Sequence, residues 1–208
     1  ATKGVVTAEL APTSLANLGA LDTASTDYIT ITVNDEDGVS PAPTDLSTLG
    51  LKTAGTVTVK FVANPVSISG TTAQLTAALV TTESKVVVDD AMVSISVSIS
   101  DTPTIGELNA IAGATTGVVT ATLADTSLSS LGALSTASTD DITITVNDAA
   151  ADDVTLDALD LSTLGLKTAG TVTVTNAVSI SGTPSEVTAA LVTPESRVEV
   201  SNAKVTIS

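Results

Sequence analysis

Acidic side chains follow several of the predicted strands, and among the residues of this chain they are the best suited to ligand chemistry. Asp35 and Asp37 stand on either side of Glu36, and Asp89 and Asp90 are adjacent. Calcium binds six to eight oxygen atoms, which carboxylates, amides and carbonyls supply. Calcium binding is therefore one prediction for these clusters. Its candidate ligands are Asp35, Asp37, Asp89, Asp90, Asp148, Asp152 and Asp153.

A structural role is our first interpretation of the same positions. Segments 31–35, 144–148 and 172–176 each end in Asn or Asp after two alternating apolar residues. Asx side chains bond the backbone two residues on and tolerate the left-handed conformations of a corner. None of the clusters completes an EF-hand loop or a Gly-Gly-x-Gly-x-Asp calcium-binding repeat. We therefore predict a stacked ladder of corner residues, with bound calcium as the alternative and no other cofactor.

Catalysis has little support in the residue types. The chain has no cysteine and no histidine, which removes thiolate and imidazole nucleophiles, zinc sites and haem ligation. A hydrolase with two catalytic carboxylates would remain, but Asp89 and Asp90 would point to opposite faces of an extended segment. Tyr28 and Phe61 are the only aromatic residues, too few for a sugar-binding platform. We predict that the protein is not an enzyme.

Charge and composition limit the classes of partner and the surroundings that we expect for the chain. Asp and Glu number 23 against 7 Lys and Arg, a net charge of −16. We predict no nucleic-acid partner, because neutralising phosphates needs a basic face. Aromatic residues make up 1% of the chain and Met92 is its one methionine, so the core is expected to be built from Val, Ile, Leu and Ala. No stretch approaches the roughly 18 apolar residues of a membrane helix, so we predict no membrane insertion. The start at residues 1–4 shows neither an initiator methionine nor a signal-peptide pattern, as expected of a processed or excised segment.

The chain contains an internal duplication. Gly4–Ala8 recurs as Gly117–Ala121, 113 residues later, and Asp45–Val59 recurs without a change as Asp160–Val174. Two near-copies therefore fill the chain. We assign residues 1–113 to copy one and residues 114–208 to a truncated copy two, each with about four coils of one continuous solenoid.

Each copy alternates between two kinds of element. Strict apolar and polar alternation predicts strands, while leucines and isoleucines three residues apart predict one face of a short helix. Helix starts are marked by Thr71–Gln74 and Thr183–Glu186, which fit a capping box, and by Thr102-Pro103. The strands are expected near residues 5–10, 29–33, 56–61, 85–88, 118–123, 142–146, 171–175 and 197–200. The helices are expected at Leu15/Leu18/Leu21, Ile105/Leu108/Ile111, Leu128/Leu131/Leu134 and Leu156/Leu159, the second spanning Thr102 to Ala114.

Repetition of strand and short helix predicts an α/β fold, a right-handed solenoid with a parallel β-sheet. At about 4.8 Å per stacked strand, some eight coils would give a rod roughly 38 Å long. The inward residues are expected to stack in parallel within one sheet. They are Val6, Ile29, Ile31, Val57, Val59, Val86, Val88, Val119, Ile142, Ile144, Val172, Val174, Val198 and Val200.

The outward strand positions are rich in threonine. Stacked coils would align them into a flat face, which resembles the ice-binding face of some β-solenoid antifreeze proteins. Threonine is also the ordinary β-branched polar residue of an exposed strand, and Glu9, Lys60 and Glu199 interrupt the array. The threonines are Thr7, Thr30, Thr32, Thr56, Thr58, Thr120, Thr122, Thr143, Thr145, Thr171 and Thr173.

Segment 101–125, the Leu-rich stretch after it and Ile142–Asp148 resemble the Ala/Thr/Val-rich repeats of giant bacterial surface proteins. The group in question is that of cyanobacterial and proteobacterial adhesin-like proteins. The resemblance implies an extracellular or cell-surface, acidic, repetitive segment. We expect a structural module, a spacer or a filament-forming segment. The alternative is a binding or adhesion module, stabilised by calcium or ice-binding through its threonines.

The two ends of the sequence suggest the partner. The chain starts inside a unit at residues 2–5 and stops at residues 205–208, where copy one continues through 97–101 into a helix. Uncapped coils leave strand edges and apolar contacts in water. We therefore expect head-to-tail contact with a second copy or with flanking repeats, which would give filaments because such contacts do not close.

Overall fold

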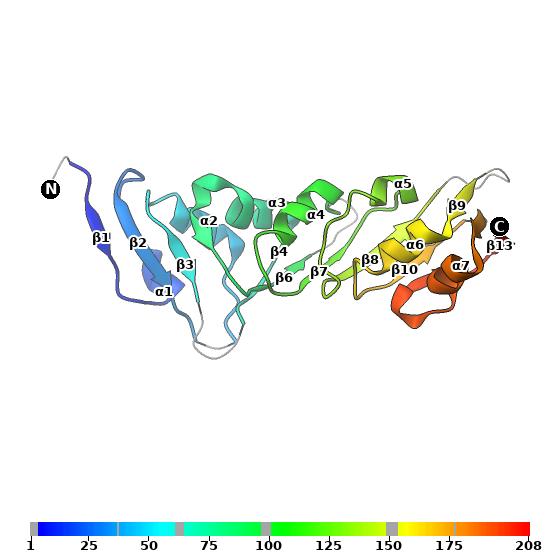
Figure 1. Cartoon of the computed structure of the whole chain (residues 1–208). Coiled ribbons are helices and arrows are strands. Elements are labelled where there is room, and N and C mark those ends of the chain that lie inside the picture. Colours follow the sequence, from blue (N-terminus) through cyan, green and yellow to red (C-terminus); the bar gives the residue numbers. More distant parts are fainter. Residues whose placement is uncertain (1–3, 37, 61–64, 97–100, 149–153, 177) are drawn as a thin grey trace. The chain divides into compact units, whose positions relative to one another are not determined.

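The computed structural model describes residues 4–36, 38–60, 65–96, 101–148, 154–176 and 178–208. Figure 1 shows short strands alternating with short helices along the whole chain. The α-helices in these residues are α1 (Leu15–Leu18), α2 (Pro43–Gly50), α3 (Thr72–Leu75), α4 (Ile105–Ala112), α5 (Leu128–Leu131), α6 (Ala158–Gly165) and α7 (Pro184–Leu191). A π-helical turn, η1 (Thr76–Val80), continues α3, and 3-10 turns form η2 (Thr82–Ser84) and η3 (Pro194–Ser196).

The described strands belong to three sheets, and every pairing in them is parallel. The prediction of a mixed α/β chain with parallel strands is therefore confirmed, whereas the prediction of one sheet is wrong. The strands are β1 (Thr7–Glu9), β2 (Tyr28–Val33), β3 (Val57–Val59), β4 (Ser67–Gly70), β5 (Val86–Val87), β6 (Met92–Ile95), β7 (Val119–Thr122), β8 (Asp141–Val146), β9 (Thr155–Asp157), β10 (Val172–Val174), β11 (Val178–Gly182), β12 (Val198–Val200) and β13 (Ala203–Ile207).

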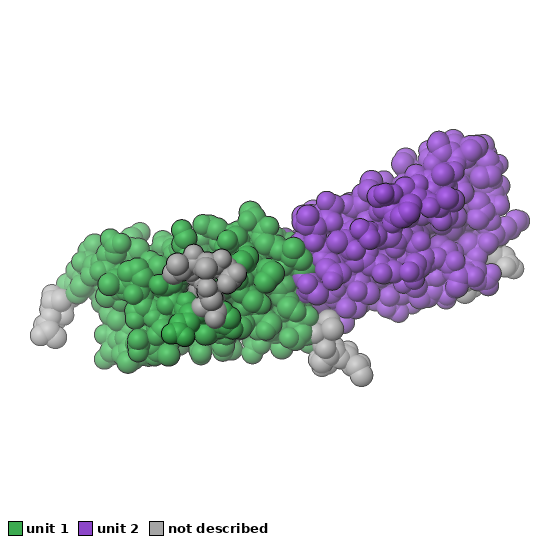
Figure 2. Space-filling model, turned by 90° about the horizontal axis from the view of Figure 1, so that it is seen from below, with its two compact units in different colours: residues 1–101, 110–119 green, residues 102–109, 120–208 purple. Residues whose placement is uncertain are grey.

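The chain divides into two compact units, coloured separately in Figure 2. Unit 1 comprises residues 1–101 and 110–119, and unit 2 comprises residues 102–109 and 120–208. In unit 1 the strands β1, β2, β3 and β5 lie side by side in that order, and β4 pairs with β6. In unit 2 β8 pairs with β10, β10 with β12, and β11 lies between β9 and β13.

Each of the eight predicted strands is present, but the alternation pattern does not predict five further strands. These five are β4, β6, β9, β11 and β13. Most coils therefore carry two strands before the helix, as in β10, β11 and α7, where the sequence predicts one. The chain turns a corner between the two strands, and in β4 and β11 the second strand is short and serine-rich. Small polar residues give little alternation signal, which is why the pattern does not reveal it.

Helix boundaries follow local capping chemistry. Thr71 and Thr183 both form the predicted capping box, with Gln74 and Glu186 as the reciprocal partners. The prediction of a cap at Thr102-Pro103 is wrong by two residues, because α4 begins at Ile105 and Thr104 caps it.

The helix predicted at Leu156/Leu159 also needs correction. Leu156 lies in β9, where its side chain is buried, and Leu159 in α6 is 52% exposed. The helix buries Leu161 and Leu164 instead, because these residues share the face that lies against the neighbouring elements.

The core is aliphatic, as predicted. The largest fully buried side chains, such as Ile31, Leu46 and Leu161, are all isoleucine or leucine. Three of the predicted inward residues depart from this pattern: Val6 is 38% exposed, and Val198 and Val200 are half-buried. They lie at the outer strands of the ladders, where no further described strand covers them. Among the described helices, none is long and apolar enough to cross a membrane.

A charge placed in this core tests its aliphatic character. We expect Val172→Asp to lower the free energy of unfolding by about 3 kcal/mol or more, because Val172 is fully buried and the core offers no partner for a carboxylate. Urea denaturation followed by circular dichroism measures the change. The control is Thr143→Asp on the exposed side of β8, where we expect about 0.5 kcal/mol. Equal losses in the two variants would contradict the inward assignment of Val172.

The capping box of α4 predicts a pH dependence. The Thr104 N–H and hydroxyl donate to Glu107 Oε2 at 2.9 and 2.8 Å. These bonds lower the pKa of Glu107 below its ordinary value of 4.5, against a small opposing effect of desolvation. The stabilisation is therefore present above pH 4.5 and is lost as the pH falls through the lower folded-state pKa.

We expect Glu107→Gln to melt below the parent protein at pH 7 and by a smaller margin at pH 3, because acid removes the carboxylate charge that the Thr104 donors stabilise. Thermal unfolding at the two pH values measures this difference. Glu199→Gln serves as the control, because Glu199 is exposed on β12. A difference between Glu107→Gln and the parent that is the same at both pH values would contradict the role of the carboxylate charge.

Candidate functional site

Asp35 and Asp148 hold the starts of two short helices. The Leu15 N–H donates to Asp35 Oδ1 at 3.1 Å, and the Leu128 N–H donates to Asp148 Oδ2 at 2.9 Å. The first amides of a helix have no partner within the helix, so each carboxylate supplies one. The partner of each side chain is a helix start that lies 20 residues earlier, and not the backbone two residues on.

The other predicted calcium ligands are dispersed. Asp89 uses its carbonyl oxygen, which accepts from the Thr116 N–H and hydroxyl at 2.8 and 2.7 Å, and Asp90 is exposed. Asp37, Asp152 and Asp153 lie outside the described residues. Within the described part of the chain, no group of three or more acidic side chains is arranged to hold a metal ion.

Asparagines of successive coils contact each other in unit 2. The Asn176 amide donates to Asn147 Oδ1 at 2.6 Å and also to the Asp148 carbonyl. Asn147 lies one coil earlier, directly after β8, as Asn176 lies after β10. This contact is one rung of the predicted corner ladder.

A second set of corner residues makes a denser network. Thr168 lies in unit 2 just before β10, and its side chain is 3% exposed. Its hydroxyl oxygen accepts from the Ile142 and Gly170 N–H groups at 2.9 and 2.8 Å. Its hydroxyl proton faces the carbonyls of Ile142 and Asp140, at 2.9 and 3.0 Å. One side chain therefore joins the start of β8 to the start of β10.

The same corner recurs in unit 1. Thr53 bonds Ile29 and Gly55 with nearly identical distances, and Thr115 bonds Ala91 and Gly117. The glycine of each Thr-x-Gly triplet lies against the preceding strand. A Cβ at Gly55 would stand 2.4 Å from the Ile29 carbonyl oxygen, so the close approach requires glycine. We call Thr53, Thr115 and Thr168 the corner threonines.

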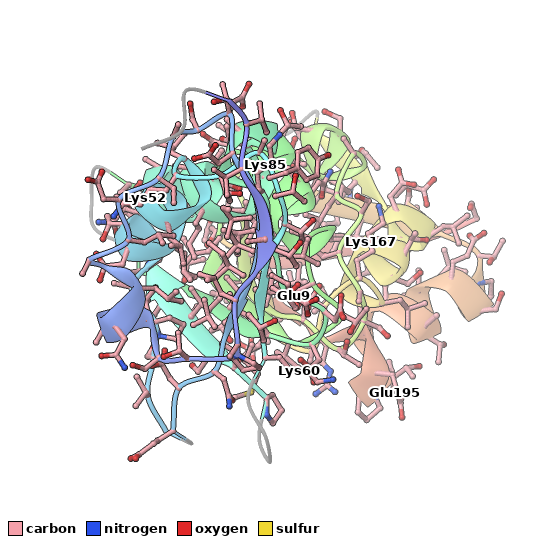
Figure 3. The ribbon with its side chains drawn as sticks, turned by 90° about the vertical axis from the view of Figure 1, so that its left-hand side faces the viewer. Glu9, Lys52, Lys60, Lys85, Lys167 and Glu195 are labelled. Atoms are coloured by element: carbon pink, nitrogen blue, oxygen red, sulfur yellow. The ribbon has the colours of Figure 1, made fainter. Side chains whose placement is uncertain are left out.

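Lysine side chains hold the other end of the short helices. The Lys52 ammonium group donates to the Gly19 and Leu21 carbonyls at 2.9 and 2.8 Å, just after α1. Lys167 makes the same pair of bonds after α5. Other charged side chains labelled in Figure 3, such as Lys60 and Glu195, are exposed and point away from the ribbon.

The outward threonines form short rows within each unit. Thr32 pairs with Thr58 in unit 1, and Thr145 pairs with Thr173 in unit 2. The rows are interrupted at the next strand, where Val87 follows Thr58 and Glu199 follows Thr173. In these rows, threonines of neighbouring strands therefore do not form a flat array wider than two or three strands.

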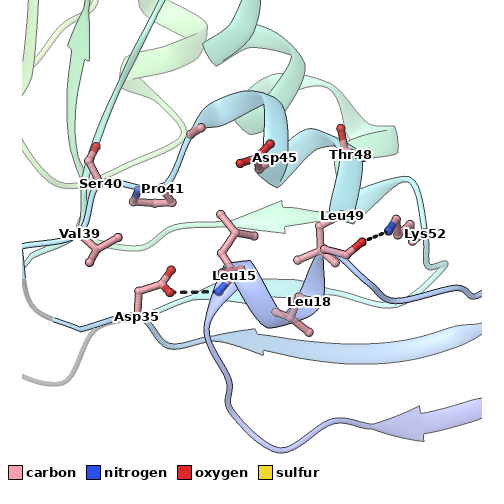
Figure 4. A pocket seen from close by; sticks show the side chains of 13 residues that line it. Leu15, Leu18, Asp35, Val39, Ser40, Pro41, Asp45, Thr48, Leu49 and Lys52 are labelled. Atoms are coloured by element: carbon pink, nitrogen blue, oxygen red, sulfur yellow. Dashed lines mark hydrogen bonds between the residues drawn. The ribbon is translucent and has the colours of Figure 1, made fainter.

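A groove with a volume of about 520 Å³ lies in unit 1 between α1 and α2. Figure 4 shows its apolar residues, Leu15, Leu18 and Leu49, on the two helices, and Val39 and Pro41 on the segment before α2. Asp35 and Asp45 lie on the same side of Lys52 in this view. We call this the α1–α2 groove.

Unit 2 has an equivalent but smaller groove between α5 and α6, of about 220 Å³. The wall contributed by the longer helix is the same in both, because Asp45, Thr48 and Leu49 recur as Asp160, Thr163 and Leu164. The difference lies in the segment before that helix, which lines the groove only in unit 1.

A proline accounts for this difference. In unit 2 the segment before α6 forms β9, and it pairs with β11 through residues such as Leu156. In unit 1 the matching residues 40–42 contain Pro41 at the place of Leu156, and proline lacks the N–H that a ladder needs. This segment is held instead by the Ser40 hydroxyl, which donates to the Ser67 carbonyl at 2.6 Å.

No family model, curated protein or solved structure matches the chain. The geometry of the two units is therefore the basis for assigning a function.

The corner threonines and the α1–α2 groove are functional features that the sequence pattern does not predict. A signal for the threonines exists, since a Thr-x-Gly triplet precedes β3, β7 and β10. The groove has no such signal, because its walls come from three segments between residues 15 and 52.

Removal of a corner hydroxyl tests its role. We expect Thr168→Val, which keeps the shape of the side chain, to lower the free energy of unfolding by about 2 to 4 kcal/mol, since the buried Ile142 and Gly170 N–H groups lose their acceptor. Chemical denaturation measures the loss. The matched control is Thr173→Val on the outward side of β10, expected to change stability by about 0.5 kcal/mol or less. A Thr168→Val variant as stable as the control would show that the corner bonds are dispensable.

Proposed function

We propose that the chain is a structural repeat module, a right-handed solenoid segment that acts as a spacer or a filament-forming part of a cell-surface or secreted protein. Its partner in this role is a second copy or a flanking repeat, in head-to-tail contact. The role requires a regular stack of coils and no reactive side chain.

The observation that carries this proposal is the register of the parallel strands. Val172 of β10 pairs with Ile144 of β8 and with Val198 of β12, so residues of one type lie above one another in successive coils. The same holds in unit 1, where Ile31, Val57 and Val86 form one row. Partners lie 26 to 29 residues apart in these rows, which is the length of one coil.

The outer strands supply a contact surface for such an assembly. Val205 and Ile207 of β13 are 45% and 54% exposed, although Val205 pairs with the buried Ile180 and Ile207 pairs with Gly182. In unit 1, Val5 just before β1 is 66% exposed. Strand edges with apolar side chains favour pairing with a further strand, which a neighbouring repeat or copy would provide.

Composition supports the placement outside the cell. The chain has no cysteine, a net charge of −16 and near-identical repeats, as in the giant bacterial surface proteins that it resembles. High charge of one sign keeps repetitive segments soluble and apart, and salt reduces that repulsion.

Substitution at the outer strand tests the filament form of the proposal. At high protein concentration and raised salt, we expect the parent protein to form thin fibres, seen by light scattering and electron microscopy. Ile207→Lys should stay monomeric, because it places a charge on the contact row. Leu166→Lys is the matched control, since Leu166 is 61% exposed after α6 and the charge change is the same.

If the parent protein is monomeric at every concentration, the proposal of a filament-forming segment is contradicted and only the proposal of a spacer remains. Loss of fibres in both variants would show that β13 is not the contact. A compact particle instead of an elongated one in small-angle X-ray scattering would contradict the solenoid itself.

A further inference from the structure

Unit 1 contains a segment that lies against the outer edge of β6. The Val93 N–H of β6 donates to the Val118 carbonyl at 2.9 Å. A Cβ at Gly117 would stand 2.3 Å from the Ala91 carbonyl oxygen, so the approach of the two backbones requires glycine. Val93 and Ile95 are both buried. The edge of β6 that faces away from β4 is therefore covered.

β13 is the equivalent of β6 in unit 2, but its outer edge is open. Residues 91–96 and 203–208 share alanine, valine, isoleucine and serine at matching positions. Val205 and Ile207 are about half exposed, whereas the matching residues of β6 are buried. Among the described strands, β13 pairs only with β11. The same apolar row is thus covered in one copy and accessible in the other.

The backbone of β13 presents hydrogen-bond donors at this open edge. The Ser208 N–H faces β11, because it donates to the Gly182 carbonyl at 3.0 Å. Successive residues of a strand direct their backbone groups to opposite edges. The N–H groups of Val205 and Ile207 therefore face away from β11, as the Val93 N–H faces away from β4.

The first strand of unit 1 has the sequence and the edge that fit these donors. Gly-Val-Val-Thr-Ala occurs without a change at residues 4–8 and 117–121. Among the described strands β1 pairs only with β2, and Figure 1 shows β1 at the edge of its sheet. The Tyr28 N–H of β2 donates to the Val6 carbonyl at 2.7 Å. The carbonyl of the preceding residue, Val5, therefore points to the other edge.

We propose that β13 is the docking site for residues 4–8 of a second copy, which add to it as a parallel strand. In the register seen in unit 1, the Val205 N–H donates to the Val5 carbonyl of the second copy, and Gly4 lies against the Ala203 carbonyl. This inference rests on the proposed function, since it names the strand and the register of the head-to-tail contact.

The contact removes apolar surface of both copies from water. Because parallel strands advance together, the register brings Val6 beside Val205 and Ala8 beside Ile207. All four side chains are accessible in the single chain. Donor and acceptor edges belong to different ends of the chain, so the contact repeats from copy to copy. Each copy carries a net charge of −16, so docking requires salt to screen the repulsion.

Engineered cysteines test the register, because the chain has none of its own. Thr7 and Thr206 are exposed and face each other in the proposed contact. Facing residues of neighbouring strands lie about 4.8 Å apart, which a disulfide can span. We expect Thr7→Cys and Thr206→Cys, mixed and mildly oxidised at raised salt, to form the mixed dimer at least about tenfold faster than Thr7→Cys with Thr143→Cys. Thr143 is equally exposed, but it lies on β8 outside the contact.

Mass spectrometry with one variant labelled with 15N distinguishes the mixed dimer from dimers of a single variant. Gly4→Ala, added to the Thr7→Cys chain, places a methyl group against the Ala203 carbonyl. We expect it to lower the rate of cross-linking to that of the Thr143→Cys mixture. The matched control is Gly106→Ala, which should leave the rate unchanged because a Cβ at Gly106 meets no atom within 4 Å. Circular dichroism verifies that the variants are folded.

Equal rates for Thr206→Cys and Thr143→Cys, or a rate that Gly4→Ala does not change, would overturn the proposed docking site. If the parent protein forms fibres under the same conditions, that result leaves the filament proposal standing and contradicts only the site. A mixed dimer that depends on Gly4, in a protein that never forms fibres, would support the site and contradict the filament form.

Discussion

The hydrogen bonds between each corner threonine and the preceding strand are the constraint on which the coil arrangement depends. Thr168 bonds both the N–H and the carbonyl of Ile142, so the start of β10 can take only one position along β8. A slip of one residue would turn every inward valine of a strand outward. The hydroxyl thus fixes the register, and the register places the aliphatic residues in the core.

The short helices depend on the same stacking. A helix of four residues, such as α1, is unstable alone. Nucleating a helix costs more conformational free energy than the hydrogen bonds of a single turn recover. Asp35 binds its first amide, and Lys52 binds the carbonyls after its last turn. Both residues come from later in the chain, so the helix is stable only once the next coil has folded against it. Unit 2 repeats this with Asp148 and Lys167.

Part of this architecture could be predicted from the sequence. Segments such as 142–146 alternate Ile or Val with Thr, and that pattern alone locates a strand with one buried face. The duplication and the capping boxes at Thr71 and Thr183 could be recognised equally well, because their signals are local. Serine-rich β4 and β11 could not be predicted, since their burial comes from the coils on either side.

The candidate site was less predictable than the fold. Asp35 is recognisable in the sequence as an acid at a corner, but its role at α1 depends on a contact 20 residues away. The effect of Pro41 could not be predicted from the sequence, because it becomes clear only by comparison with copy two, where the matching segment forms β9. Contacts of this kind are set by three-dimensional packing, which residue types and spacing do not encode on their own.

Amide hydrogen exchange, read residue by residue by NMR on dilute protein, tests the central claim most directly. If corner bonds and stacked ladders hold the coils, the amides of Ile29, Ile142 and Val172 exchange slowest, because each is bonded to the next coil. The exposed strands β1 and β13 exchange fastest. Equal protection of all strands, or fast exchange at Ile142, would contradict the account.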